Sequence, residues 1–186
     1  VAVRLLGTRT GRGVRAWSFV GLTAAVDDLD GIPTEVPAVD GVGAAAAVGA
    51  AHANGALLID HVVVTTPAPE RTIAALEATG LVHRRTRLAD GYAEPMRQDF
   101  FRAGEVILEL IGPRTPDPDR ADRPARLYGL AHTVADLDGT ASTLGDLLTD
   151  PKDAVQPGRR IATLKTRDLD MSVPTAFLTP GPGALA

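Results

Sequence analysis

From residue 57 onward, the apolar positions follow first the period of a strand and then that of a helix. Residues 57–66 (LLIDHVVVTT) form a β-branched run that is typical of a buried strand. Pro69 and Glu70 suit the first turn of a helix, where proline needs no hydrogen bond and an acidic group meets the positive end of the helix dipole. Ile73 and Leu76 then share one helical face. The pattern predicts a strand that leads directly into a helix.

Three more strands are expected after this helix, in residues 81–88, 96–103 and 105–112. The short link Ala103-Gly104 joins the last two and predicts a tight hairpin. With the turn at that link, Gln98 would lie opposite Glu109. The first half of the chain therefore has the order β-α-β-β-β, and the same register would place Phe100 opposite Ile107.

The second half repeats this order. Residues 127–134 read as a strand, and Asp136 is the expected N-cap of a helix over residues 137–148. Sliding the halves over each other superimposes TTPAPERT on TVADLDGT, which indicates an internal repeat. We expect a first module over residues 57–113 and a second over 126–180, within one domain over 57–186. The remaining pieces of the second module are a short extended segment at 154–158 and strands at 159–166 and 173–180.

Residues 1–56 lie outside the repeat. Residues 1–7 and 14–22 are expected to form an N-terminal β-hairpin, and Trp17 and Phe19 on one of its faces are expected to pack in a core. Residues 36–56 are rich in glycine and alanine and poor in large apolar groups, so we interpret them as a linker.

Composition excludes several kinds of protein. The 186 residues are 45% hydrophobic, which is enough to bury one sizeable core or two small ones. A net charge of -4 with scattered basic residues argues against a nucleic-acid surface. No apolar run approaches the roughly 20 residues that cross a membrane, so we expect a cytoplasmic protein. The absence of cysteine excludes disulfides, thiolate catalysis and cysteine-ligated metals.

The tandem of β-α-β-β-β units, opened by DHVVVTTPAPERT and by VADLDGT, resembles the vicinal oxygen chelate superfamily. That superfamily includes glyoxalase I-like lyases, extradiol dioxygenases, certain epimerases and drug-sequestering proteins such as those of bleomycin resistance. The segments RQDFFRAGEVILELIGP and DAVQPGRRIATL are similar to its actinobacterial glyoxalase-like members. The resemblance implies an α+β fold in which tandem βαβββ modules form a cup of curved mixed sheet, here with an N-terminal β-hairpin extension.

The resemblance also implies where a metal would bind. Family members that bind metal place ligands on the first and fourth strands of each module, and these positions hold His61 and Glu109 in the first module. An imidazole and a carboxylate suit Zn, Fe, Mn or Ni. The equivalent positions of the second module are Gly129 and Ala176, which cannot ligate through a side chain. Two protein ligands are fewer than the three that catalytic zinc sites usually keep.

Strand alternation supplies the rest of the expected site. Ile107, Glu109 and Ile111 share one face of their strand, and Val106, Leu108 and Leu110 share the other. We expect a cup lined by His61, Glu109 and the ligand-binding candidates Gln98, Phe100 and Ile107. Glu109 is also the candidate catalytic group, since a carboxylate can act as a general acid or base.

Two functions remain open at this stage. The first is a glyoxalase-like small-molecule-binding protein, monomeric or homodimeric, with an incomplete metal site in the cup between its two modules. The alternative is a metal-dependent lyase, isomerase or dioxygenase using a divalent ion on His61 and Glu109. The same two residues could also be a buried hydrogen-bonded pair without an ion. His132, His83 and the pair Arg159–Arg160 are expected outside the site, on exposed or helix-facing positions.

Overall fold

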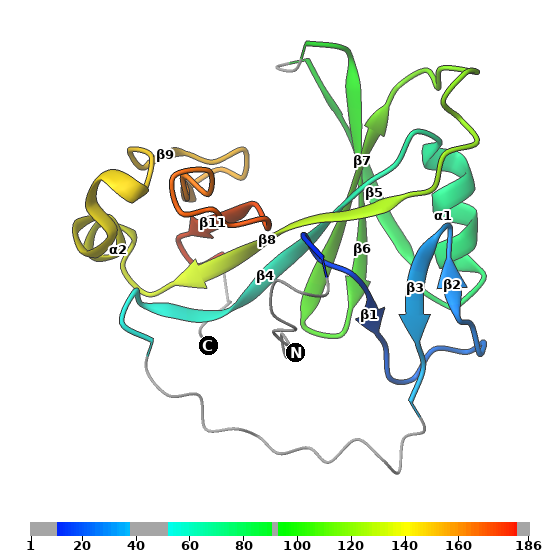
Figure 1. Cartoon of the computed structure of the whole chain (residues 1–186), viewed down its shortest axis with the longest axis horizontal. Helices are drawn as coiled ribbons and strands as arrows, with labels where there is room; N and C mark the ends of the chain where they lie inside the picture. The colour runs from blue at the N-terminus through cyan, green and yellow to red at the C-terminus, as the bar shows by residue number, and fades with distance from the viewer. Residues whose placement is uncertain (1–10, 38–51, 91–92, 182–186) are drawn as a thin grey trace. The chain divides into compact units, whose positions relative to one another are not determined.

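The chain folds into two compact units, which are described separately below (Figure 1). The computed structural model describes residues 11–37, 52–90 and 93–181. Unit 1 comprises residues 1–12, 45–61 and 129–186, and unit 2 comprises residues 13–44 and 62–128.

Unit 2 contains the β-α-β-β-β order predicted for the first module. Strand β4 (Ala56–Thr65) enters this unit at residue 62 and is followed by helix α1 (Pro69–Glu77), with Pro69 in its first turn as expected. Strands β5 (His83–Ala89), β6 (Met96–Ala103) and β7 (Val106–Pro113) then pair antiparallel, and the sheet order is β5-β6-β7-β4. The hydrophobic pattern therefore predicted these five elements correctly.

The core of unit 2 lies on one face of this sheet, against α1. Ile73 and Leu76 of α1 belong to the same buried cluster as Leu108 and Leu110 of β7. The other face of β7 carries half-buried side chains, among them Glu109, so the predicted alternation is confirmed. Each fully buried leucine or isoleucine contributes about 1.5–3 kcal/mol to folding. This core holds the opposite, polar face in place.

The N-terminal segment packs onto the same core. Strands β1 (Trp17–Ser18), β2 (Asp28–Leu29) and β3 (Ile32–Glu35) form a three-stranded sheet in the order β1-β3-β2, with β1 parallel to β3. Leu29 and Ile32 are members of the buried cluster, and Trp17 and Phe19 pack against it as expected. The first strand of the predicted N-terminal hairpin, residues 1–7, lies outside the described residues. Residues 17–18 of its second strand pair with β3.

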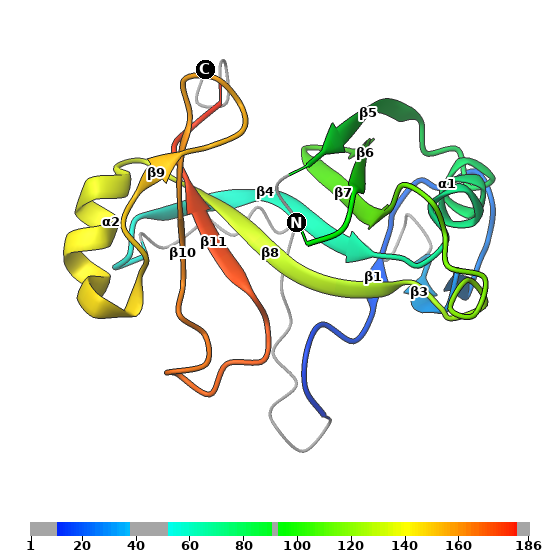
Figure 2. The same ribbon diagram turned by 90° about the horizontal axis from the view of Figure 1, so that it is seen from above.

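Unit 1 holds the elements predicted for the second module. Strand β8 (Arg126–Val134) enters it at residue 129 and pairs in parallel with β11 (Thr175–Leu178), while β10 (Arg160–Thr163) pairs antiparallel with β11 and with β9 (Lys152–Asp153). Figure 2 shows β11 between β8 and β10. Parallel and antiparallel pairs occur together, so this is a mixed sheet and the α+β fold class is confirmed.

Helix α2 (Leu137–Leu144) begins as the sequence predicts and ends earlier. Asp136 caps it by accepting a hydrogen bond from the Asp138 backbone nitrogen at 3.0 Å. Gly145 takes a φ of +53°, which ends the α-helix, and the rest of the predicted helix is a 3-10 turn, η3 (Gly145–Leu147). Residues 154–158, predicted as an extended segment, instead form bends and a turn, and the two-residue strand β9 (Lys152–Asp153) lies just before them.

A second buried cluster forms the core of unit 1. It consists of Val134, Leu137, Leu148, Ala162, Leu164 and Phe177. These residues come from β8, α2, β10, β11 and neighbouring loops, so the repeated order of elements is matched by a core in each unit. Among the residues that the structure describes, no helix has the length and apolar character to cross a membrane.

Candidate functional site

The β6–β7 hairpin corrects the register expected from the sequence. Ala103 pairs with Val106, so the two loop residues are Gly104 and Glu105 rather than Ala103 and Gly104. Gly104 takes a φ of +61°, which glycine adopts at little cost and which suits the first loop position of a tight hairpin turn. As a result, Gln98 lies opposite Ile111, not Glu109, and Phe100 lies opposite Glu109, not Ile107.

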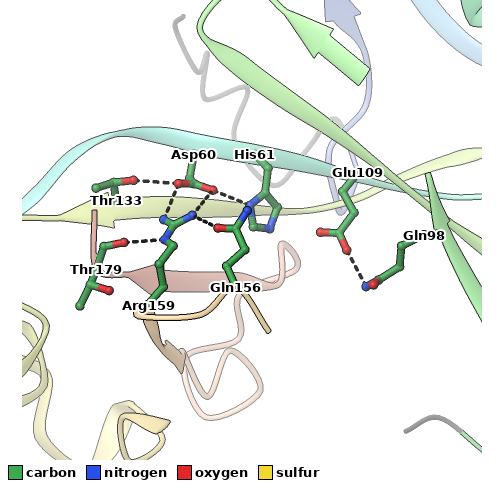
Figure 3. A network of polar contacts seen from close by, with 8 residues as sticks. All are labelled: Asp60, His61, Gln98, Glu109, Thr133, Gln156, Arg159 and Thr179. Atoms are coloured by element: carbon green, nitrogen blue, oxygen red, sulfur yellow. Dashed lines mark hydrogen bonds and ion pairs between the residues drawn. The ribbon is translucent and has the colours of Figure 1, made fainter. Parts of the chain in front are cut away.

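The correction shifts the register by two residues and therefore keeps every side chain on its expected face. Gln98 remains beside Glu109 as a diagonal neighbour, and its Nε2 donates to Glu109 Oε1 at 2.7 Å (Figure 3). Gln98 is buried, with 6% of its surface exposed. Arg87 on β5 donates from Nη1 to Gln98 Oε1 at 2.8 Å. A hydrogen-bonded chain thus crosses the face from β5 to β7.

Phe100 and Ile107 complete this face. Phe100 is half-buried, and the guanidinium carbon of Arg85 lies 4.5 Å from the centre of its ring. Ile107 is half-buried and pairs across the hairpin with Arg102. We call the face formed by Arg85, Arg87, Gln98, Phe100, Ile107 and Glu109 the polar face of unit 2. It contains every predicted site residue except His61.

His61 lies in unit 1, at the residue where β4 passes from one unit to the other. Its Nδ1 is 2.8 Å from Asp60 Oδ1, and 18% of its side chain is exposed. The predicted pairing of His61 with Glu109 joins residues of two different units and stays a prediction.

Asp60 is the centre of a buried network that sequence reasoning missed. Arg159 Nη2 donates to Asp60 Oδ2 at 2.5 Å, and Thr133 Oγ1 donates to the same oxygen at 3.0 Å (Figure 3). Arg159 also donates to Gln156 Oε1 at 2.7 Å and to the Thr179 carbonyl at 2.8 Å. Only 4% of the Arg159 side chain is exposed, so the expected exposed position is wrong for this residue.

Two opposing effects act on the Asp60 carboxyl. Burial works to raise its pKa, but hydrogen bonds from His61 and Arg159 and the charge of Arg159 outweigh it, so the pKa of Asp60 lies far below its ordinary value. Asp60 is therefore ionised at neutral pH and only accepts hydrogen bonds. It follows that Nδ1 of His61 carries the proton in this contact.

One sequence signal could have pointed to this network. Asp60 is a carboxylate inside an apolar strand, and a buried charge without a partner is costly. The signal requires a cation nearby without saying which one. Arg159 lies 99 residues further along the chain, in a segment whose pattern resembles an exposed turn.

A comparable network exists in unit 2. Asp99 is fully buried and receives two hydrogen bonds of 2.8 Å from Arg97 and one of 2.6 Å from Thr86 Oγ1. His83 Nε2 lies 3.1 Å from Asp99 Oδ1, and its ring is 5.2 Å from that of Phe101. His83 is therefore half-buried on the core side of the sheet, which corrects its expected exposed position.

His132 is half-buried, with its ring 5.9 Å from the ring of Phe177. Burial lowers the pKa of His132, and the nearby imidazoles of His52 and His61 lower it further. The side chain is therefore more readily neutral than an exposed histidine.

The described residues do not fit a complete metal centre. No three or more of their His, Asp and Glu side chains are grouped so that they could hold an ion. A Cβ added at Gly129 would lie 2.5 Å from the Pro174 carbonyl oxygen, so this position admits no side chain without a shift of the backbone. Ala176, in β11, offers no donor either.

Known proteins share this architecture. A family model described as the glyoxalase/bleomycin resistance protein/dioxygenase superfamily matches residues 60–162. Methylmalonyl-CoA epimerase from Mycobacterium tuberculosis superposes with a TM-score of 0.53 at 19% identity, covering 73% of this chain and all of the other. A hypothetical protein from Bacillus halodurans gives 0.52 at 17% identity, covering 68% of this chain and 96% of the other.

A variant of 4-hydroxymandelate synthase from Streptomyces coelicolor gives a TM-score of 0.51 at 17% identity, covering 69% of this chain and 51% of the other. At these identities the likeness shows the fold and carries no activity with it. No curated protein matches the chain.

Proposed function

Because the chain belongs to the glyoxalase/bleomycin resistance protein/dioxygenase superfamily, we propose that it binds a small organic molecule on the polar face of unit 2, without a resident metal ion. The observation that carries this proposal is the hydrogen-bonded chain from Arg87 through Gln98 to Glu109. Ligand sites typically combine apolar surface with a few fixed polar groups, and this face has both.

The hydrogen bonds from Arg87 and to Glu109 fix the orientation of the Gln98 side-chain amide. Arg87 can only donate, so Gln98 presents its oxygen to Arg87 and its NH2 group to Glu109. Because Gln98 is buried, it has little freedom to rearrange. Groups held in advance lose less conformational entropy when a ligand binds, which supports a binding role for this face.

The absence of a metal from this proposal rests on the donor set. In the second module Gly129 and Ala176 stand where the family places ligands, and the first module offers only His61 and Glu109. Two protein donors are fewer than the three of most catalytic zinc sites. Gln98 and Phe100 supply contacts that need no ion.

A second candidate function is favoured by one specific contact. Asp60 accepts a hydrogen bond from Nδ1 of His61, which puts the lone pair of the ring on Nε2. A carboxylate behind a histidine in this way commonly orients imidazoles that bind metal. The second candidate is therefore a metal-dependent lyase, isomerase or dioxygenase with a divalent ion on His61 and Glu109.

Metal binding separates the two candidates. Protein purified without a histidine tag is dialysed against Zn²⁺, Mn²⁺, Ni²⁺ or Fe²⁺ and its metal content is measured, for the natural chain and for His61→Ala. The metal-free proposal expects no stoichiometric binding by either protein. One bound equivalent that disappears in His61→Ala would establish the second candidate and contradict the first.

Ligand binding is tested directly by nuclear magnetic resonance. Bleomycin and methylmalonyl-CoA, suggested by the family and by one solved relative, and a set of small aromatic fragments are titrated into labelled protein. We expect at least one probe to shift backbone signals along β5, β6 and β7. Failure of every probe at millimolar concentration to shift these signals would count against the polar face as a binding site.

A further inference from the structure

An open depression on the surface of unit 1 has no part in the proposed function. Its volume of about 380 Å³ lies within the range of roughly 300–1,000 Å³ that is typical of small-molecule sites. It is formed by the loop between β10 and β11 together with the residue after Leu148. The lining consists of Thr149, Leu164, Lys165, Thr166, Arg167 and Asp168.

Backbone hydrogen bonds hold this depression in shape. The Lys165 N–H donates to the Leu147 carbonyl at 2.7 Å, and the Asp168 N–H donates to the Lys165 carbonyl at 3.1 Å. The Thr149 N–H donates to the Thr163 carbonyl at 2.9 Å. The segments that line the depression are therefore fixed before any ligand binds, which lowers the entropy cost of binding.

Hydrogen-bond donors predominate in the lining. Lys165 and Arg167 are exposed and, within the described ranges, form no ion pair and no side-chain hydrogen bond. Thr149 Oγ1 accepts from the Thr163 N–H at 2.9 Å, and its own O–H has no acceptor among the residues that the structure describes. The same holds for the Arg167 backbone N–H. An ammonium, a guanidinium, a hydroxyl and an amide are thus available to an incoming acceptor.

The acidic residues of this loop leave the two cations unneutralised. Asp170 accepts instead from Arg12, at 2.9 Å. Asp168 lines the depression, but in the described part of the chain it forms no ion pair with either cation. Two cations against one carboxylate leave the lining with one net positive charge, on a chain whose net charge is -4.

We infer that this depression binds a small organic phosphate, with the phosphate group on Lys165 and Arg167 and the apolar part of the molecule against Leu164. Ammonium and guanidinium groups both bind phosphate in proteins. A phosphate monoester carries about two negative charges and three acceptor oxygens, which suits two cations and two neutral donors better than a carboxylate does. The site belongs to unit 1, and the inference is independent of the polar face of unit 2.

Exposed basic side chains also have a simpler use, which is to keep the surface charged and soluble. Lys152 on β9 serves that use: it is exposed, lies outside the lining, and makes no interaction with the described residues. It is therefore the matched control for Lys165. A binding site predicts that the two lysines differ in their effect on phosphate affinity, whereas general surface charge predicts that they are alike.

The test is a nuclear magnetic resonance titration of the full chain at constant ionic strength. The probes are phenyl phosphate, inorganic phosphate, which lacks the apolar part, and benzoate, which lacks the phosphate. We expect phenyl phosphate to bind tightest and to shift the backbone signals of residues 164–168. Lys165→Gln and Arg167→Gln should each weaken its binding about 10-fold, the loss of one charge-assisted hydrogen bond, and Lys152→Gln should leave it unchanged.

Asp168→Asn should strengthen phosphate binding about 2- to 5-fold, because it removes the one negative charge of the lining. Equal losses in Lys152→Gln and Lys165→Gln, or no shift of these signals at millimolar phenyl phosphate, would overturn the site. Benzoate or inorganic phosphate binding as tightly as phenyl phosphate would overturn the ligand class. Signals of β5, β6 and β7 report separately on the proposed function.

Discussion

The guanidinium of Arg159 and the carboxylate of Asp60, 99 residues apart in the sequence, lie 2.5 Å apart inside unit 1. Only 4% of the Arg159 side chain and 11% of the Asp60 side chain are exposed. The contact joins β4 to the segment before β10, and the same carboxylate lies 2.8 Å from Nδ1 of His61. Two charged groups with so little exposed surface depend on each other, because water can replace little of the interaction between them.

We predict that Asp60→Asn destabilises the protein strongly. Asparagine keeps the shape of the side chain but leaves Arg159 buried without an anion, which costs about 3–5 kcal/mol of the free energy of unfolding. The measurement is urea unfolding. The matched control is Asp170→Asn, which removes the exposed Arg12–Asp170 pair and should cost less than about 1 kcal/mol. Equal losses in the two variants would contradict the prediction.

The two carboxylates around Arg97 give a second comparison within one site. Asp99 has no exposed surface, whereas 77% of the Glu70 side chain is exposed. Asp99→Asn should lower the free energy of unfolding by about 3 kcal/mol or more, because it leaves a guanidinium facing a neutral group in the core. Glu70→Gln should change it by less than about 1 kcal/mol. Denaturant midpoints of both variants check the difference, and a larger loss in Glu70→Gln would refute it.

His132 makes folding stability depend on pH. Burial and the neighbouring imidazoles lower the pKa of His132 in the folded protein, so between that pKa and its ordinary value of about 6.5 the unfolded chain binds more protons. Stability from this residue is therefore complete above about pH 6.5 and falls as the pH drops below it. His132→Gln should flatten the decline in stability below about pH 6.5.

The check on His132 combines two measurements. Unfolding curves at several pH values give the slope for the natural chain and for the variant. A nuclear magnetic resonance titration gives the pKa of the ring itself. A measured pKa at or above that of an exposed histidine would contradict both the burial argument and the predicted slope.

Gly129→Ala should destabilise unit 1. The added Cβ would meet the Pro174 carbonyl oxygen at 2.5 Å, so the backbone must move. Overpacking of this kind costs about 1–3 kcal/mol. Thermal unfolding measures the loss. If Gly129→Ala left stability unchanged, the position would tolerate a side chain. Steric crowding would then not explain why a metal-ligating side chain is missing there.

A comparison at Gly104 separates crowding from backbone strain. A Cβ at this position meets nothing within 4 Å, but the φ of +61° is unfavourable for alanine. Gly104→Ala should therefore cost about 1–2 kcal/mol through the backbone alone. The loss of stability in Gly104→Ala should therefore come from the backbone conformation alone, whereas that in Gly129→Ala comes from contact with Pro174.

The sequence by itself determined the order of elements and the faces of the strands. Pro69 at the start of α1 and Asp136 at the cap of α2 act through neighbours in the chain, so their effects are visible locally. The alternation in β7 likewise follows from the geometry of any strand. For this reason the prediction that Gln98 and Glu109 share one face was correct, although the register predicted for them was wrong.

Only the tertiary structure decided which residues are partners. The register of the β6–β7 hairpin depends on the loop conformation around Gly104, and a change of two residues exchanges every cross-strand pair. That Phe100 pairs with Arg85 on one side and with Glu109 on the other could not be known before that register. The pairing of Asp60 with Arg159 also could not be predicted from the sequence. A buried carboxylate requires a cation nearby, but only the path of the whole chain decides which cation that is.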